Sequence, residues 1–257
     1  MKSFWPIGNN VPTNIYFGKG AGHRLEKSLQ HAQKSIKIIS PYVSPALVSI
    51  LIEKQREGVD VSLCIPTSTD NTAFLHKDIF RQILNQEIFP NEINIGKRKK
   101  QLQISKFFLI MCLLCTLFYL FFPFKDSDKN FFPISAVYVV CLIGFIALYR
   151  IYRKLAFSLP IKMFIYTPKF KFKAIKTSHV QPFIHLKLFI IDNDCAFFGS
   201  ANFTSNGFNH NIESICKITD EEALAKAAAC FSDIFSLSNC FELSELGHLS
   251  FPENYYF

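Results

Sequence analysis

From residue 14 onward, the chain alternates short apolar runs with segments of helical spacing. Two of the runs end at prolines, Pro41 and Pro66, and Leu25 and Leu29 lie four residues apart on one face of a helical segment. The predicted strands are 14–17, 35–40 and 59–65, and the predicted helices are 21–33, 46–56 and 76–86. Strand–helix–strand units of this length predict an α/β sandwich with parallel strands.

The same alternation returns in the C-terminal part of the chain. The predicted strands are 161–166, 183–192, 195–198 and 212–218, and a helix is predicted over 220–237. Asp220, Glu221 and Glu222 stand in the first turn of this helix, where the helix dipole favours negative charge.

Two long apolar runs separate these parts. Residues 107–124 contain only two non-apolar members, Thr116 and Pro123, and residues 131–149 contain no charge. A bilayer core about 30 Å thick needs roughly 20 such residues per helix. Buried core helices are the alternative, but these usually keep a polar face and neither run has one. The two runs, joined by residues 125–130, therefore predict a transmembrane hairpin.

Basic residues flank both outer ends of this hairpin. The eight cations are Lys97, Arg98, Lys99, Lys100 and Lys106 before it, and Arg150, Arg153 and Lys154 after it. The positive-inside rule places both outer ends in the cytosol. We therefore expect an integral membrane protein with two spans, whose termini and catalytic domain are cytosolic. The expected divisions are 1–104 and 152–257 for the two halves of one domain, and 105–151 for the hairpin.

Composition changes this picture little. The formal net charge of +8 suits anionic partners such as phospholipid or nucleic acid, but the flanks of membrane spans can also produce it. The eight cysteines show no pairing or metal-ligand spacing, and Cys112-x-x-Cys115 lies among apolar residues, which indicates buried thiols. Unpaired cysteines fit a reducing compartment, and the N-terminus lacks the apolar core of a secretory signal.

One run after the hairpin carries a constellation suited to phosphoryl chemistry. Its specified residues, in order, are His185, Lys187, Asp192, Gly199, Ser200 and Asn202. On a strand, positions two apart face the same way, so His185 and Lys187 should project together. That arrangement pairs a nucleophilic imidazole with a cation able to hold a phosphate oxygen.

The second half of the run supplies further polar groups. Gly199 permits a tight turn, after which Ser200 and Asn202 offer hydroxyl and amide donors to the same oxyanion. Glu213 follows Ser200 by 13 residues in a predicted strand. A carboxylate there could hold the imidazole N–H and fix its tautomer.

This run resembles the HxK(x)4D(x)6GSxN signature of the phospholipase D superfamily, and every position agrees. Ser40-Pro41-Tyr42, the strand end at 64–66, and Glu213 also stand where that family's elements would be. The stretch 199–204 resembles the small single-motif members, which include a bacterial endonuclease and the mitochondrial cardiolipin hydrolase. The resemblance implies a phospholipase D-like α-β-α sandwich, and the hairpin inserted into the middle of the domain departs from the family pattern.

The resemblance also implies a two-step reaction with no metal or cofactor. His185 would attack the phosphodiester phosphorus and form a phosphohistidine. Lys187 and Asn202, assisted by Ser200, would stabilise the equatorial oxygens. Asp192 would be mainly structural.

A second histidine would protonate the leaving group and then activate water. In the family that histidine comes from another copy of the motif, so the single copy here implies a homodimer with a shared active site. His76, His179 and His210 are the alternatives within the chain.

Three lysines just upstream alternate with two phenylalanines over 169–173. On a strand this pattern gives one basic and one apolar face. It is typical either of a rim that gathers anionic headgroups or a nucleic-acid backbone, or of an edge strand protected by lysines.

The leading hypothesis is a membrane-embedded phospholipase D that hydrolyses or transfers phospholipid headgroups. The alternatives are a membrane-tethered, metal-independent nuclease of the same superfamily and a catalytically silent membrane scaffold.

Overall fold

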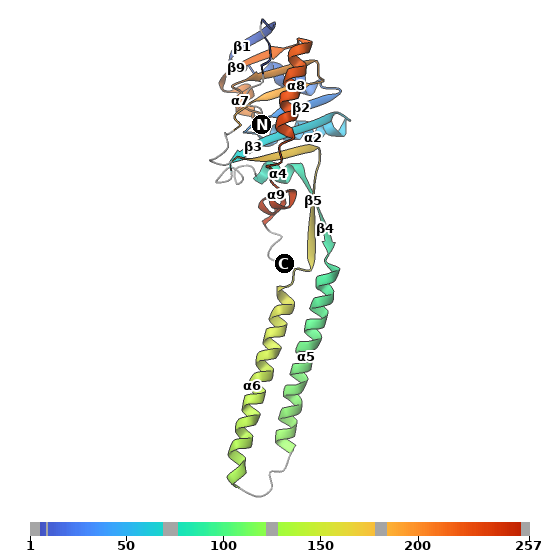
Figure 1. Ribbon diagram of the computed structural model, residues 1–257, viewed down its shortest axis with the longest axis vertical. Coiled ribbons are helices and arrows are strands. Elements are labelled where there is room, and N and C mark those ends of the chain that lie inside the picture. The colour runs from blue at the N-terminus through green and yellow to red at the C-terminus, as the bar shows by residue number, and fades with distance from the viewer. Residues whose placement is uncertain (1–5, 9, 69–76, 122–127, 178–183, 253–257) are drawn as a thin grey trace. The chain divides into compact units, whose positions relative to one another are not determined.

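The computed structural model describes residues 6–8, 10–68, 77–121, 128–177 and 184–252. Their contacts divide the chain into two compact units. One unit comprises Met1–Glu87 and Tyr166–Tyr256, and the other comprises Ile88–Ile165. The first holds the sheet and the second holds two long helices (Figure 1).

The first unit is built on a seven-stranded mixed sheet. In spatial order its strands are β1 (Thr13–Lys19), β9 (Ile212–Ile218), β8 (Cys195–Gly199), β7 (Leu188–Ile191), β2 (Ser35–Ile39), β3 (Asp60–Ser68) and β6 (Lys171–Thr177). Strands β2 and β3 run parallel, as the sequence predicts, and β3 also pairs parallel with β6, whose place in the sheet was not predicted. The remaining neighbours pair antiparallel, including β7 with β2. The short connection between β7 and β8 allows only an antiparallel pair.

Helices cover both faces of this sheet. On one face pack α1 (His23–Gln30), α2 (Pro45–Arg56), α4 (Lys77–Ile83), α7 (Ser205–Asn209) and α9 (Leu243–Ser250). On the other face α8 (Glu221–Phe235) buries Leu224, Ala227, Phe231 and Ile234 against the sheet. Asp220 begins α8 by accepting a hydrogen bond from the Ala223 N–H. The predicted α-β-α sandwich is thus confirmed.

The structure corrects the extent of several predicted elements. The helix predicted over 21–33 spans only His23–Gln30. The helix predicted over 76–86 ends at Ile83 and is followed by β4 (Leu84–Pro90), which forms a separate two-stranded sheet with β5 (Lys162–Pro168). Strand β7 begins at Leu188 and not at 183. The short helices α7 and α9 were not predicted.

The second unit contains α5 (Glu92–Phe121) and α6 (Asp128–Ser158). Both helices are long and apolar enough to cross a membrane, with mean hydropathies of 2.2 and 1.8 in their most apolar windows. Only 11% of the α5 window and none of the α6 window is buried within the protein. Such exposure is not that of core helices in a soluble protein, which bury an apolar face.

Aromatic and polar contacts pair α5 with α6 along their length. The Tyr119 and Tyr138 rings stack at 4.3 Å between centroids, and the Tyr138 hydroxyl donates to Thr116 Oγ1 at 3.3 Å. Nearer the other end, the Phe108 and Phe145 rings stack at 6.2 Å. Because later residues of α5 meet earlier residues of α6, the helices run antiparallel and form a hairpin.

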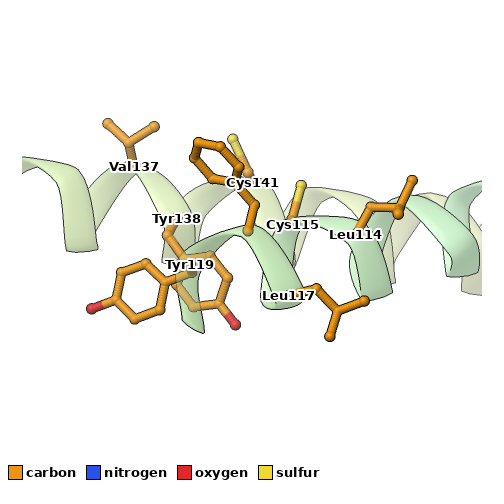
Figure 2. A pocket seen from close by; sticks show the side chains of 8 residues that line it. Leu114, Cys115, Leu117, Tyr119, Val137, Tyr138 and Cys141 are labelled. Carbon is orange, nitrogen blue, oxygen red and sulfur yellow. The ribbon is translucent and has the colours of Figure 1, made fainter. Parts of the chain in front are cut away.

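A groove of about 620 Å³ lies along this hairpin beside the tyrosine pair (Figure 2). Its lining residues are Leu114, Cys115, Leu117, Phe118, Tyr119, Val137, Tyr138 and Cys141. The lining is almost wholly apolar, as expected of a surface in contact with lipid chains.

Candidate functional site

The predicted site residues gather at one edge of the seven-stranded sheet. His185 and Lys187 precede the start of β7, Ser200 and Asn202 follow the end of β8, and Glu213 lies near the start of β9. Because β7 with β8 and β8 with β9 are antiparallel, these three strand ends lie at the same edge. The sheet topology thus brings the two halves of the motif together.

His185 and Lys187 contact each other directly. The Lys187 Nζ lies 2.9 Å from His185 Nδ1 and 3.0 Å from Nε2, and it also donates to the His185 carbonyl oxygen at 3.1 Å. Both residues lie before β7, so strand alternation is not what places them together. The His185 ring is exposed, whereas Lys187 is only 5% exposed.

Burial lowers the pKa of Lys187 below the ordinary value for lysine, because it disfavours the charged ammonium. The Glu213 carboxylate acts in the opposite direction and raises it. The site therefore holds a cation that is largely removed from water, where its attraction for a phosphate oxygen is stronger than at the surface.

The Glu213 carboxylate is held by two other side chains. Its Oε2 accepts a hydrogen bond from the Ser200 hydroxyl, and its Oε1 accepts one from Asn211 Nδ2 at 3.1 Å. Ser200 Oγ in turn accepts from the Ser214 N–H at 3.0 Å. The Ser200 proton thus points to Glu213. That Glu213 orients His185, and that Ser200 donates to a phosphate oxygen, stay predictions.

Gly199 allows this close approach of β8 to β9. A Cβ at position 199 would lie 2.0 Å from the Ser214 carbonyl oxygen, a distance that no side chain can occupy. The same carbonyl oxygen accepts the Ser200 N–H at 3.0 Å. The glycine of the motif is therefore required by packing between strands.

Asn202 presents an unsatisfied acceptor. Its side-chain Oδ1 is buried and has no hydrogen-bond partner among the described residues. Buried polar atoms are nearly always paired, and this unpaired atom lies at the same end of the sheet as His185 and Lys187.

The segment after β2 anchors the loop that carries Asn202. The Ser40 hydroxyl accepts the Phe203 N–H at 3.0 Å and donates to the Tyr42 carbonyl oxygen at 2.8 Å. The Ser44 N–H donates to the Phe203 carbonyl oxygen at 3.0 Å. The Ser-Pro-Tyr segment singled out in the sequence thus contacts the residue that directly follows the motif.

Asp192 has a structural position away from the other site residues. In the turn between β7 and β8 its carboxylate accepts the N–H groups of Gln33, Lys34 and Ser35, the closest at 2.6 Å. Burial acts to raise its pKa, but these hydrogen bonds and the Lys34 charge outweigh burial, and the pKa lies below the usual value. Asp192 therefore holds the start of β2 to the β7–β8 turn.

The three lysines over 169–173 are engaged within the protein. Lys169 Nζ donates to the Gln82 carbonyl oxygen at 2.7 Å, Lys171 pairs with Asp60 at 2.9 Å, and Lys173 donates to the Leu237 carbonyl oxygen at 3.2 Å. Strand β6 is the last strand of the sheet. These contacts favour the edge-strand interpretation over a rim for anionic ligands.

The alternative histidines remain without a demonstrated role. His76 and His179 lie outside the described residues, and His210 is exposed at the end of α7. Among the residues that the structure describes, no group of three or more His, Cys, Asp or Glu side chains is placed to hold a metal ion.

One polar neighbour of the site escaped sequence reasoning. Asn211 fixes the second oxygen of Glu213, yet it stands in no position of the motif. Its closeness in sequence to Glu213 was the only available signal.

One family model matches part of the chain, including the motif. Residues 146–235 match the family model described as "Cardiolipin synthase, PLD-like domain". That segment contains all six predicted site residues: His185, Lys187, Asp192, Ser200, Asn202 and Glu213. No curated protein matches the chain.

Several solved structures resemble the chain distantly. NucT from Helicobacter pylori is 14% identical, with a TM-score of 0.42 over 90% of this chain and 98% of that one. The phospholipase D family member Nuc from Salmonella typhimurium is 13% identical, with a TM-score of 0.42 over 90% and 99%. Phosphatidylserine synthase from Haemophilus influenzae is 13% identical, with a TM-score of 0.43 over 95% and 43%. Similarity this distant assigns no substrate.

Proposed function

We propose that this chain, which belongs to the phospholipase D superfamily, is a membrane-embedded phosphodiesterase that hydrolyses or transfers phospholipid headgroups. The observation that carries the proposal is the contact between the exposed His185 ring and the buried Lys187 ammonium, in a chain that also has two apolar helices.

In the first step, a His185 ring nitrogen attacks the phosphodiester phosphorus. The bond from phosphorus to the headgroup oxygen breaks, and a second histidine gives a proton to the departing alcohol. A covalent phosphohistidine remains. In the second step, that histidine takes a proton from water or another alcohol, whose oxygen attacks phosphorus and releases His185. Water gives hydrolysis, and an alcohol gives transfer.

Two groups are suited to stabilise the charge that develops on the equatorial oxygens. Lys187 offers an ammonium held within 3.1 Å of His185 atoms, so its charge stands next to the reacting nitrogen. The Asn202 amide lies in the anchored loop that follows β8. Donors fixed beforehand in this way need no reorganisation during the reaction.

We propose further that the second histidine is His185 of another copy of the chain. The motif occurs once, and a two-fold axis at the sheet edge would bring two copies of it together. This assigns the active enzyme as a homodimer.

The two long apolar helices support lipid over nucleic acid as the substrate. The exposed apolar faces of α5 and α6 suit a bilayer, and the basic residues at their outer ends support cytosolic placement of the termini and of the catalytic domain. A site tethered in this way stays near the headgroup layer, where phospholipid is concentrated.

The test uses purified protein and vesicles of headgroup-labelled phospholipids. Release of the headgroup, or exchange onto an added alcohol, should occur in wild type and be lost in His185→Ala. The control variant is Glu53→Gln, at an exposed position of α2, and it should keep the wild-type activity on the same vesicles. Absence of turnover across phosphatidylcholine, phosphatidylethanolamine, phosphatidylglycerol and cardiolipin would contradict the proposal. Cleavage of DNA or RNA in the presence of chelator would favour the nuclease instead.

A further inference from the structure

The positive charge of this protein is concentrated at one end of the hairpin. Eight cations lie there: Lys97, Arg98, Lys99, Lys100, Lys106, Arg150, Arg153 and Lys154, here called the basic collar. The whole chain has 28 Lys and Arg against 20 Asp and Glu. With the collar set aside, 20 cations remain against 20 carboxylates, so the collar accounts for the entire net charge of +8.

The two helices bring both parts of the collar to the same level. The Arg98 guanidinium lies 4.5 Å from the centre of the Phe157 ring, and the Arg153 guanidinium lies 5.8 Å from the same ring. Arg98 comes from α5, and both Phe157 and Arg153 come from α6. The contact therefore joins the basic segments of the two helices into one surface.

The collar begins where the apolar surface ends. Lys106 directly precedes the apolar run that starts at Phe107, and Arg150 directly follows the run that ends at Tyr149. From Lys106 to Lys97 the helix rises about 14 Å, which is enough to cross the headgroup layer on one side of a bilayer. The ring of Tyr152 stacks on Phe108 at this boundary, as expected of an aromatic belt.

Four lysines of the collar have no ion-pair partner among the residues that the structure describes. Lys97, Lys99, Lys100 and Lys154 are exposed, and within the described residues no ion pair joins any of them to a carboxylate. Lysines elsewhere in the chain are paired in several cases, for example Lys171 with Asp60. The collar thus presents several exposed cations that are able to take an anionic ligand.

We propose that the basic collar binds the phosphate groups of anionic phospholipids and enriches them around the hairpin. Zwitterionic lipids carry no net charge and gain less from the same contacts. Enrichment of this kind would supply an anionic phospholipid to the active site. The relevance of lipid binding to catalysis therefore rests on the proposed function. Binding itself does not depend on turnover.

The experiment measures bound lipid in a His185→Ala background, where no lipid is consumed. Protein is reconstituted in phosphatidylcholine vesicles containing phosphatidylglycerol, purified in mild detergent, and its retained lipids are quantified by mass spectrometry. We expect phosphatidylglycerol to exceed its input share. Replacing Lys97, Lys99 and Lys100 by Gln should lower that enrichment at least about fivefold, since one cation near a membrane surface contributes on the order of a fivefold change in binding.

The matched control replaces three exposed lysines of the other unit, Lys19, Lys27 and Lys77, by Gln, and should leave the enrichment unchanged. The five collar cations that remain should still direct the orientation of the hairpin in the membrane. Orientation is checked in cells by labelling an engineered cysteine near the C-terminus with a membrane-impermeant reagent. The proposal is overturned if the collar variant enriches phosphatidylglycerol as much as its His185→Ala parent does. It is also overturned if the control variant loses as much enrichment as the collar variant. Headgroup turnover is measured separately. Its absence would contradict the proposed function but not the proposal that the collar binds anionic phospholipid.

Discussion

At the scale of single residues, the most constrained group of the site is the Lys187 ammonium. It is nearly equidistant from both ring nitrogens of His185 and is almost wholly buried. A cation held in this way must be protonated to stabilise a phosphate oxyanion, so its titration should be visible in the activity.

The first prediction concerns the alkaline limb of activity. Because burial lowers the pKa of Lys187, kcat/KM should fall at a pH below the value of about 10.4 that is typical of exposed lysine. Glu213 raises that pKa, so Glu213→Gln should move the limb to still lower pH, whatever its effect on the maximal rate. A pH profile of kcat/KM measures both. Glu53→Gln serves as control, and a limb that stays in place in Glu213→Gln would contradict the assignment.

A second prediction concerns Asp192 and stability. Asp192→Ala removes an acceptor from three backbone N–H groups, and should lower the free energy of unfolding by about 1–3 kcal/mol at neutral pH. The folded-state pKa of the carboxyl is depressed, so its contribution is present above the unfolded pKa of about 3.9 and is lost as the pH falls through the folded value. The difference between wild type and variant should therefore shrink in acid.

Thermal or denaturant unfolding of detergent-solubilised protein at several pH values tests this. Asp194→Asn, in the same turn but exposed, is the matched control and should change stability little. A variant difference that is as large in acid as at neutral pH would mean that Asp192 acts through something other than its charge.

The sequence identified the residues of the candidate site, but it did not predict most of the contacts between them. The spacing of His185 and Lys187 correctly implied that they project together, although a segment before the strand, and not strand alternation, brings them into contact. The Ser200–Glu213 hydrogen bond was not predictable, because it depends on how β8 and β9 pair. Contacts between distant segments are set by strand register, which the local pattern does not reveal.

At the scale of elements, the sequence predicted most accurately those strands and helices whose local hydrophobic pattern is strong. Strand β9 has the predicted bounds, and helix α2 begins one residue before its predicted start. The start of strand β4 was taken for the end of a helix because its partner strand, β5, lies beyond the hairpin in the sequence. Helix α9 carries a capping box formed by Glu242 and Glu245, a signal present in the sequence but without the Ser or Thr that usually marks it.

The third prediction tests the β8–β9 contact on which the site rests. Gly199→Ala would place a methyl group 2.0 Å from the Ser214 carbonyl oxygen, so the strands must separate and displace Ser200. We expect a loss of at least about 1–3 kcal/mol in unfolding free energy, the usual cost of overpacking, and a strong loss of headgroup release. In Gly96→Ala, inside α5, no neighbouring atom lies within 4 Å of the new Cβ, so the change should not lower the unfolding free energy. Equal behaviour of the two variants would contradict this account.

At the scale of the whole molecule, the two units differ in where their apolar residues lie. The seven-stranded unit buries its apolar residues on both faces of a sheet, whereas α5 and α6 leave theirs exposed. Since one copy of the motif provides one nucleophile, the remaining question for catalysis is whether a second chain completes the site.

Subunit mixing answers that question quantitatively. If the shared active site needs His185 from both copies, a heterodimer of wild type and His185→Ala is inactive, and activity falls as the square of the wild-type fraction. Co-expression in equal amounts should then give about one quarter of the wild-type activity per total chain, because only homodimers of wild type remain active. Chains that act alone should give about one half, since each wild-type copy keeps its own site. Co-expression with Lys27→Gln, an exposed change on α1, controls for expression and should leave activity near the wild-type level. Headgroup release measured on purified mixtures therefore separates a shared site from one completed within the chain.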